Sequence, residues 1–329
     1  MKNIKPQGKF VNYILRFSVI HTISYFLVAI IFVAFQNALP DADSIGLNLY
    51  QPFRALDTIN ILGQLLRGLA FGFVFYPFYH IVFNRKGGRL LLFLSMWAVG
   101  LFCSVEPQPG SIEGIIYTVI TFAEHASVLI AVGIQMLLFV WLIFWIENRF
   151  AENNLLEIGV QFSLNQKNLK GYIIRFTLVH LFTYWVVGGI FYELTGYNDA
   201  LETMEIFNLW RPMESLNTVL LVFFGQIFRG TLLAVLLYPF YKIYIDKKSG
   251  WAQLYLLMIG LTILGSPLFL TEFIDFNGSI AEFIKSLAVG IPEIFSQMLM
   301  FSLIFFFWQR RSENKRMKIV HSNMCIFLT

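Results

Sequence analysis

Long stretches of the chain contain apolar residues almost without interruption. A helix that crosses a bilayer needs about 20 such residues in a row, at about 1.5 Å per residue. Continuous runs, rather than alternating ones, also disfavour an outer-membrane barrel. We therefore predict an all-α integral membrane protein with eight transmembrane helices. The apolar runs extend over Phe17 to Phe35, Phe71 to Phe83, Leu90 to Val105, Ala126 to Ile146, Phe176 to Tyr192, Gly230 to Tyr241, Trp251 to Leu270 and Leu287 to Trp308.

Several short motifs occur once in each half of the chain, which indicates an internal repeat. Four helices in each half would return the chain to its starting side of the membrane. We therefore expect two tandem four-helix repeats in parallel orientation, related by a pseudo-two-fold axis along the membrane normal. The motif pairs are Tyr13–Phe17 and Tyr172–Phe176, Gly63–Gly68 and Gly225–Gly230, Tyr76–Tyr79 and Tyr238–Tyr241, Gly110–Ile112 and Gly278–Ile280, and Gln135–Leu137 and Gln297–Leu299.

These patterns divide the chain into four predicted parts. Residues 1–148 form the first membrane repeat, and the polar residues 149–171 form a cytoplasmic linker. Residues 172–311 form the second membrane repeat, and residues 312–329 form a basic cytoplasmic tail.

Composition and charge agree with a membrane location. Hydrophobic residues make up 57% of the chain and charged residues 13%, against roughly 45–50% and 25% in soluble proteins. Lys and Arg gather in alternate segments between the apolar runs, so the positive-inside bias places both termini in the cytoplasm. The net charge of +4 follows from this topology and does not indicate nucleic-acid binding. The expected partner is the lipid bilayer, and the oligomeric state is not predicted.

Four polar residues inside the predicted spans occupy repeated motifs. Arg67 follows Gln64 by one helical turn, and Arg229 follows Gln226 in the same way. A charged side chain within a membrane costs roughly 2.5–3.5 kcal/mol on insertion scales, so a repeated one suggests a role. One interpretation is an outer vestibule that binds a small anionic or polar solute. The alternative is a pair of arginines that extend to the lipid headgroups. Asp57 continues the polar face only in the first half.

Three further polar residues lie in the last predicted spans of the two halves, one in the first half and two in the second. Gln135 and Gln297 are expected near mid-depth, where an amide usually bonds to a neighbouring helix. Glu293 is ionisable and is expected at a depth where it could pair with Arg229 or Arg67. Such a pair would be structural or would couple to protons.

The two halves also repeat a histidine, His21 and His180, which we expect in the cytoplasmic half, in a different layer from the arginines. Two such residues could ligate a haem or metal, or each could be neutral and hydrogen-bonded. The two cysteines form no paired motif, and we predict no cofactor. On the outer side, Ser111 and the Ser279–Glu282 pair are expected to cap short helices that begin at the two Gly-Ser-Ile motifs.

The segment from Glu106 to Thr118, with Gln64-x-x-Arg67-Gly68 and Tyr76-Pro77-Phe78 upstream, resembles uncharacterised multi-pass membrane proteins of bacteria and archaea. The resemblance covers most of the chain. It implies a prokaryotic cytoplasmic membrane and no particular activity.

Three functions are compatible with these features. The first is a transporter or channel for a small anionic or polar solute. The second is a non-catalytic scaffold or accessory subunit whose polar residues hold helices together. The third is a membrane enzyme that modifies lipid or binds haem, which the absence of common catalytic motifs disfavours.

Overall fold

The computed structural model describes residues 10–38, 58–84, 86–150, 166–194, 210–212, 215–263 and 290–326, which form an all-helical fold. No strand occurs in these segments, although Thr118 and Trp210 form one isolated antiparallel bridge. The predictions for Asp57 and for residues 279–289 lie outside the described residues.

Six helical segments are long and apolar enough to cross a membrane, so the chain is a multi-pass membrane protein. Pro77 and Pro239 each interrupt one segment with a short 3-10 turn, because proline lacks the N–H that the helix ladder needs. The segments are α1 (Phe10–Asn37); α2 (Thr58–Phe75) with η2 (Tyr76–Phe78) and α3 (Tyr79–Phe83); α6 (Phe122–Phe150); α7 (Gln166–Leu194); α9 (Leu216–Leu237) with η5 (Tyr238–Phe240) and α10 (Tyr241–Ile245); and α14 (Ile291–Ile326).

The predicted third and seventh spans correspond to shorter helices. The third is α4 (Gly88–Leu94), which continues as the π-helical segment η3 (Ser95–Phe102). The seventh is α11 (Gly250–Thr262), whose 13 residues reach about 20 Å, less than the roughly 30 Å of a bilayer core. The described helices thus provide six candidate spans and two shorter apolar helices.

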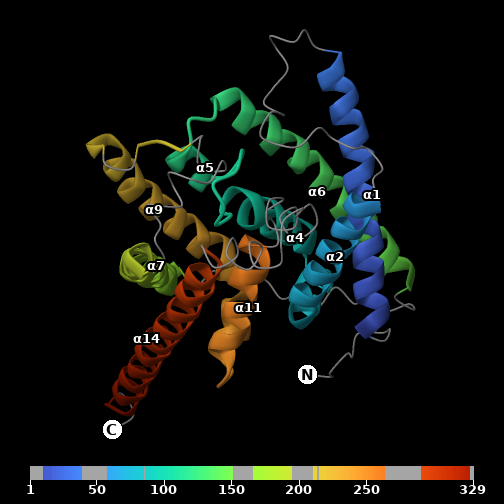
Figure 1. Cartoon of the computed structure of the whole chain (residues 1–329). Helices are drawn as coiled ribbons and strands as arrows, with labels where there is room; N and C mark the ends of the chain where they lie inside the picture. The colour runs from blue at the N-terminus through green and yellow to red at the C-terminus, as the bar shows by residue number, and fades with distance from the viewer. Residues whose placement is uncertain are drawn as a thin grey trace.

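The long helices pack in two groups (Figure 1). In the first, α1 lies against α2 and α6, and in the second, α7 lies against α9 and α14. The groups meet where α11 contacts α2 and η3, and where α9 contacts η3. The short helix α5 (Ile112–Tyr117) precedes α6 in sequence but packs against α9, so it links the two groups.

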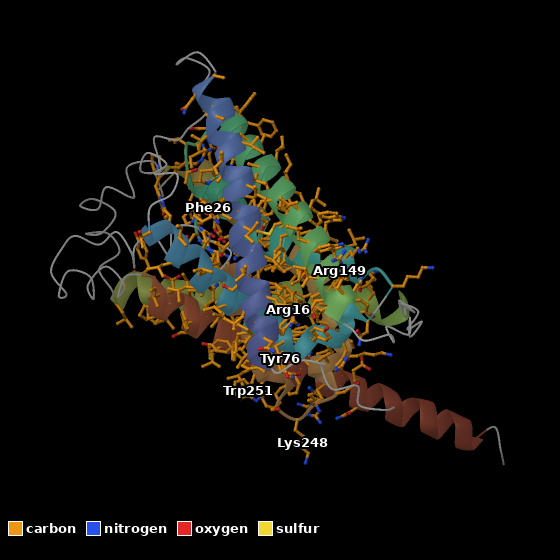
Figure 2. All side chains as sticks on the ribbon, turned by 90° about the vertical axis from the view of Figure 1, so that its right-hand side faces the viewer. Arg16, Phe26, Tyr76, Arg149, Lys248 and Trp251 are labelled. Atoms are coloured by element: carbon orange, nitrogen blue, oxygen red, sulfur yellow. The ribbon has the colours of Figure 1, made fainter. Side chains whose placement is uncertain are left out.

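The outer surface of the bundle is strongly apolar. On α1, Val19, Ile23, Leu27 and Ile30 recur at helical spacing and are about half exposed. An apolar face of this kind is typical of contact with lipid. Figure 2 shows Tyr76, Lys248 and Trp251 toward one end of the molecule, with Phe26 of α1 farther toward the other.

A polar contact joins the first and last long helices of each group. Arg16 Nε of α1 donates to Glu147 Oε1 of α6 at 2.7 Å, and the Tyr79 hydroxyl donates to the other carboxylate oxygen at 2.8 Å. In the second group, Arg175 Nε of α7 donates to Gln309 Oε1 of α14 at 2.6 Å. Helices far apart in the sequence are thereby fixed side by side.

Glycines allow the first two long helices of each group to approach closely. A methyl group on Gly68 of α2 would lie 2.6 Å from Ser18 Cα of α1. A methyl group on Gly230 of α9 would lie 2.8 Å from His180 Cδ2 of α7. Small residues at such contacts are typical of helix packing within membranes.

Candidate functional site

The site is built around α5, which begins at a serine cap. The backbone of Ser111 is extended, and its side-chain oxygen accepts a hydrogen bond from the Gly114 N–H at 2.8 Å. This bond satisfies one of the donors that the first turn of a helix leaves open. The same buried hydroxyl donates to the Gln108 carbonyl oxygen at 2.8 Å. The helix start predicted at this Gly-Ser-Ile motif is therefore confirmed.

Contacts at both ends hold α5 in place. The Gly110 N–H donates to His125 Nδ1 of α6 at 2.9 Å, and Gly110 has a left-handed φ of 85° that suits glycine. At the other end, the Arg211 N–H donates to the Tyr117 carbonyl oxygen at 2.7 Å. The Tyr117 ring also stacks on Trp210, with 5.2 Å between ring centroids. Thus α5 connects α6 to the segment that precedes α9.

One glycine brings α5 close to α9. A methyl group on Gly225 would lie 2.7 Å from Ile116 Cγ1 of α5. This close approach directs the neighbouring side chain Glu113 toward α9, where Gln226 and Arg229 follow Gly225.

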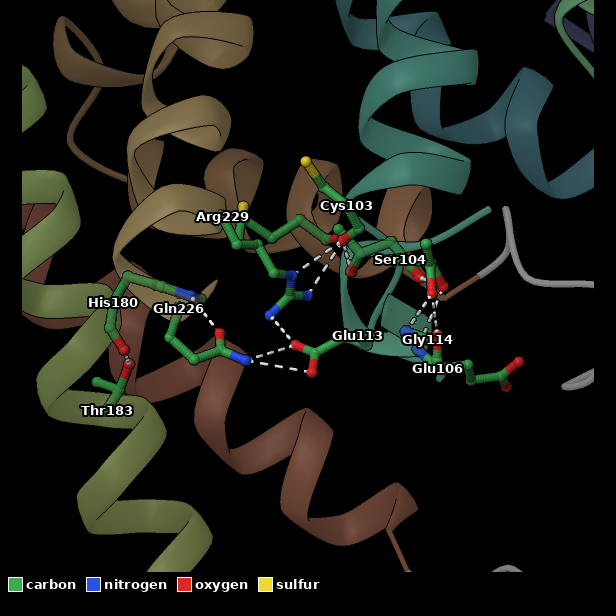
Figure 3. A network of polar contacts seen from close by, with 12 residues as sticks. Cys103, Ser104, Glu106, Glu113, Gly114, His180, Thr183, Gln226 and Arg229 are labelled. Carbon is green, nitrogen blue, oxygen red and sulfur yellow. Dashed lines mark hydrogen bonds and ion pairs between the residues drawn. The ribbon is translucent and has the colours of Figure 1, made fainter. Parts of the chain in front are cut away.

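A buried polar network results (Figure 3). Glu113 Oε1 lies 2.8 Å from Arg229 Nη1, and both carboxylate oxygens accept from Gln226 Nε2, at 3.0 and 3.1 Å. Arg229 Nε and Nη2 donate to the Cys103 carbonyl oxygen at 3.3 and 3.1 Å. Arg229 is 2% exposed and Glu113 is 3% exposed, so the ion pair lies in the protein interior. The alternative in which Arg229 extends to lipid headgroups is therefore wrong.

His180 extends this network to α7. Its Nε2 lies 3.1 Å from Gln226 Oε1, within hydrogen-bond distance. The prediction that the histidines occupy a different layer from the arginines is therefore wrong for His180. The reason is that α7 already begins at Gln166, well before Arg175, so His180 lies several turns inside the helix.

The ionisation of Glu113 reflects two opposing effects. Burial raises the pKa of the Glu113 carboxyl, while the Arg229 guanidinium and the Gln226 amide act in the opposite direction because they stabilise the carboxylate. Removal of either partner from a buried ion pair of this kind strongly destabilises the folded protein, because the other charge is left buried without compensation. In chemical terms, the site is a carboxylate held by one guanidinium and one amide out of contact with water.

Comparisons with protein-family models, curated proteins and solved structures found no match. Within the described part of the chain, no three His, Cys, Asp or Glu residues gather in a way that could hold a metal ion.

The other predicted site residues lie apart from this ion pair. In α2, Gln64 and Arg67 are buried, and both lie near the His21 ring of α1. Gln135 of α6 and Gln297 of α14 are also buried.

Glu293 lies in the first turn of α14. Its Oε1 is close to α7, where a methyl group on Gly188 would lie 3.3 Å from it. The carboxylate that pairs with Arg229 is that of Glu113, so the alternative in which Glu293 pairs with Arg229 is wrong, while its pairing with Arg67 stays a prediction.

Glu113 is not among the site residues predicted from the sequence. Residue 281, at the matching position of the second half, is alanine, so no repeated acid marks this position. The serine cap at Ser111 was the available indication, because it predicted an ordered helix with Glu113 in its first turn.

Proposed function

We propose that this multi-pass membrane protein is a transporter or channel for a small anionic solute, with Arg67, Arg229, Gln64 and Gln226 as binding groups. One observation supports this most directly: Arg229 and Gln226 together bind a carboxylate in the protein interior. The same pair of residue types occurs at Gln64 and Arg67, so each half of the chain contains donors suited to an anion.

The energetics also favour a role beyond packing. Replacement of a buried ion pair by apolar residues is often neutral or stabilising, so stability alone gives little reason to keep one. Ionisable residues inside membrane proteins are commonly associated with solute or ion pathways. In this proposal, Gln135, Gln297 and Glu293 are additional polar contacts along the path.

The proposed arrangement has eight crossings in two parallel repeats, in a bacterial or archaeal cytoplasmic membrane, with both termini in the cytoplasm. In this arrangement, α4 with η3 and α11 would cross together with residues beyond their ends. Gly88 and Gly250, which begin these two helices, pack against the carbonyl groups of Val82 and Tyr244 at matching sequence positions. This similarity supports two repeats of related design.

Flux measurements on purified protein in lipid vesicles would test the proposal. We expect the protein to take up labelled acetate, chloride or phosphate. Arg67→Ala and Arg229→Ala should each reduce this uptake by about tenfold or more, which is the effect of losing one charge-assisted hydrogen bond. Arg149→Ala is the control, because Arg149 is exposed near the end of α6 and stacks on the exposed Trp145 ring at 4.0 Å. Arg229→Lys would keep the charge if the alanine variant does not fold. Folded variants that bind and transport every tested anion as the unaltered protein does would disprove the proposal.

The alternative function is a membrane scaffold, and the complete pairing of Arg229 with Glu113 favours it. A double variant, Arg229→Met with Glu113→Leu, separates the two functions. A scaffold would retain its stability and its partners with this apolar pair. A transporter would remain folded and lose flux.

A further inference from the structure

An apolar groove lies between the two groups of helices, where α11 contacts α2. From the first group, α1 and α2 contribute Ile14, Ala70 and Phe73 to its lining. From the second, α11 and α14 contribute Ile259 and Phe295. The groove has a volume of about 550 Å³, within the range of roughly 300–1,000 Å³ that is typical of ligand sites. The described residues that line it are all apolar, so the groove suits an apolar group.

The groove has a closely packed floor and an exposed rim. Val74 of α2 and Gly260 of α11 both line the groove and are buried. A methyl group on Gly260 would press on the Val74 side chain, whose Cγ1 would lie 2.8 Å away. By contrast, the lining residues Phe10, Leu66 and Phe73 are exposed. The groove therefore opens on the apolar outer surface of the bundle, which faces the lipid.

The size and chemistry of the groove limit what can fill it. On α2 its lining extends from Leu66 to Val74, which is about 12 Å of helix. A helix of that length, at a diameter of about 10–12 Å, would occupy roughly 900–1,400 Å³ and is too large. An irregular peptide segment would place backbone N–H and C=O groups against apolar side chains, which is strongly unfavourable. A lipid acyl chain is narrower than a helix and has no such polar groups.

One end of the groove lies near aromatic residues of the kind found at a membrane surface. The ring of Phe10, at the rim, packs edge-on against the ring of Tyr76, with 4.5 Å between centroids. Figure 2 shows Tyr76 together with Lys248 and Trp251 toward one end of the molecule. Tyr and Trp are enriched where the apolar core of a membrane meets the headgroups. The headgroup of a lipid in the groove is therefore expected at this end.

The turn between α10 and α11 carries an excess of positive charge. Lys247 and Lys248 are exposed there, and Arg310 Nη1 of α14 donates to the Lys247 carbonyl oxygen at 3.4 Å. Asp246, also exposed, is the opposing charge in this turn. Basic residues near a membrane surface attract lipids with negatively charged headgroups. The charge of this turn therefore favours an anionic lipid.

We infer that the groove binds one acyl chain of a phospholipid with a negatively charged headgroup, which lies against the basic turn between α10 and α11. The first lining residue of α11, Leu256, follows the start of this helix at Gly250 by about 9 Å. The headgroup can therefore reach the turn while the chain enters the groove. Such a lipid contacts both groups of helices at once and stabilises their packing.

Native mass spectrometry of the full-length protein in detergent would test the site, with phosphatidylglycerol and phosphatidylcholine of equal chain length as probes. We expect one phosphatidylglycerol to bind more tightly than phosphatidylcholine. Ala70→Leu introduces the residue type of Leu232, at the matching position of the second half. It should weaken phosphatidylglycerol binding by about tenfold, the effect of displacing about two methylene groups. Ala34→Leu, on the exposed surface of α1, is the control and should leave the affinity unchanged. Ala70→Val replaces Ala70→Leu if that variant does not fold.

A change of charge in the turn tests the choice of headgroup. Lys248→Gln should weaken phosphatidylglycerol binding by about fivefold, the effect of one basic residue near an anionic headgroup. The same variant should bind phosphatidylcholine as the unaltered protein does. Lys86→Gln is the matched control, because Lys86 is exposed two residues before α4, as Lys248 is before α11. It should change the affinity for neither lipid.

Three outcomes would overturn the inference. The first is equal affinity of Ala70→Leu and the unaltered protein for phosphatidylglycerol. The second is equal affinity of the unaltered protein for the two lipids. The third is a dimer that Ala70→Leu separates into monomers, because a second copy of the chain would then fill the groove. The inference is independent of solute uptake, so a failure of the transport proposal would leave it intact.

Discussion

At the scale of single residues, the burial of Glu113 and Arg229 makes each side chain depend on the other. Both side chains are almost completely buried. An isolated charge in the protein interior would be strongly unfavourable. Their attraction and the bond from Gln226 compensate for the lost hydration. The stability of the protein should therefore be more sensitive to this pair than to surface charges.

Glu113→Ala should destabilise the protein by about 3–5 kcal/mol, because it leaves the Arg229 guanidinium buried and uncompensated. Unfolding by denaturant or heat in detergent micelles would measure this effect. Glu124→Ala is a suitable control, since Glu124 accepts bonds from Thr121 at the surface and its loss should cost about 1 kcal/mol or less. Equal stability of the two variants would show that the buried pair does not form.

Ser111→Ala should cost about 1–2 kcal/mol, because it leaves the Gly114 N–H without its capping oxygen. The same substitution at Ser215, which caps the exposed start of α9, should cost less because water can replace the serine oxygen there. The difference in unfolding free energy between the two variants is the measurement. A larger effect at Ser215 would contradict the central role of α5.

At the scale of helices, close packing depends on glycines in α2 and α9. Gly68→Ala should destabilise the protein by about 1–3 kcal/mol, because the added methyl group would press on the α1 backbone at Ser18 and force the helices apart. Thermal unfolding of the purified protein would measure this cost. Gly189→Ala is the matched control within α7, where a methyl group would meet nothing within 4 Å. Alanine favours a helix more than glycine does, so that variant should be as stable as the parent or more so.

Most helices could be predicted from sequence, because uninterrupted apolar runs determine both their position and their membrane character. The interruptions at Pro77 and Pro239 lie inside such runs, and the apolar pattern alone did not place them as helix breaks. The predicted run of Leu90 to Val105 extends slightly past the end of η3 at Phe102, since an apolar loop residue and an apolar helix residue look alike in sequence.

The candidate site was predicted only in part, because its partners come from distant parts of the chain. Gln226 and Arg229 were recognisable as polar residues within an apolar helix. Glu113 was not, since its role depends on α5 packing against a helix of the other group. No local pattern around Glu113 encodes that contact.

At the scale of the whole molecule, the number of crossings determines which side of the membrane each loop occupies. Lys86 and Lys248 are exposed residues before the two shorter helices. With eight crossings both lie in the cytoplasm, whereas with six crossings they lie on opposite sides. Two variants, Lys86→Cys and Lys248→Cys, each with both native cysteines replaced by serine, would test this. With eight crossings, a membrane-impermeant thiol reagent should label each variant from the cytoplasmic side only. Labelling of residue 248 from outside would support six crossings.

The ribosome makes the chain from its N-terminus, so the contact between α5 and α9 cannot form until α9 has been synthesised. Glu113 leaves the ribosome 113 residues before Gln226, a delay of about 6–23 s at typical rates of synthesis. During that interval Arg229 is not yet available to the Glu113 carboxyl, so this group lacks the partner that it has in the folded protein. Closure of the ion pair is therefore a late event in assembly, and it can occur only after α9 has been synthesised.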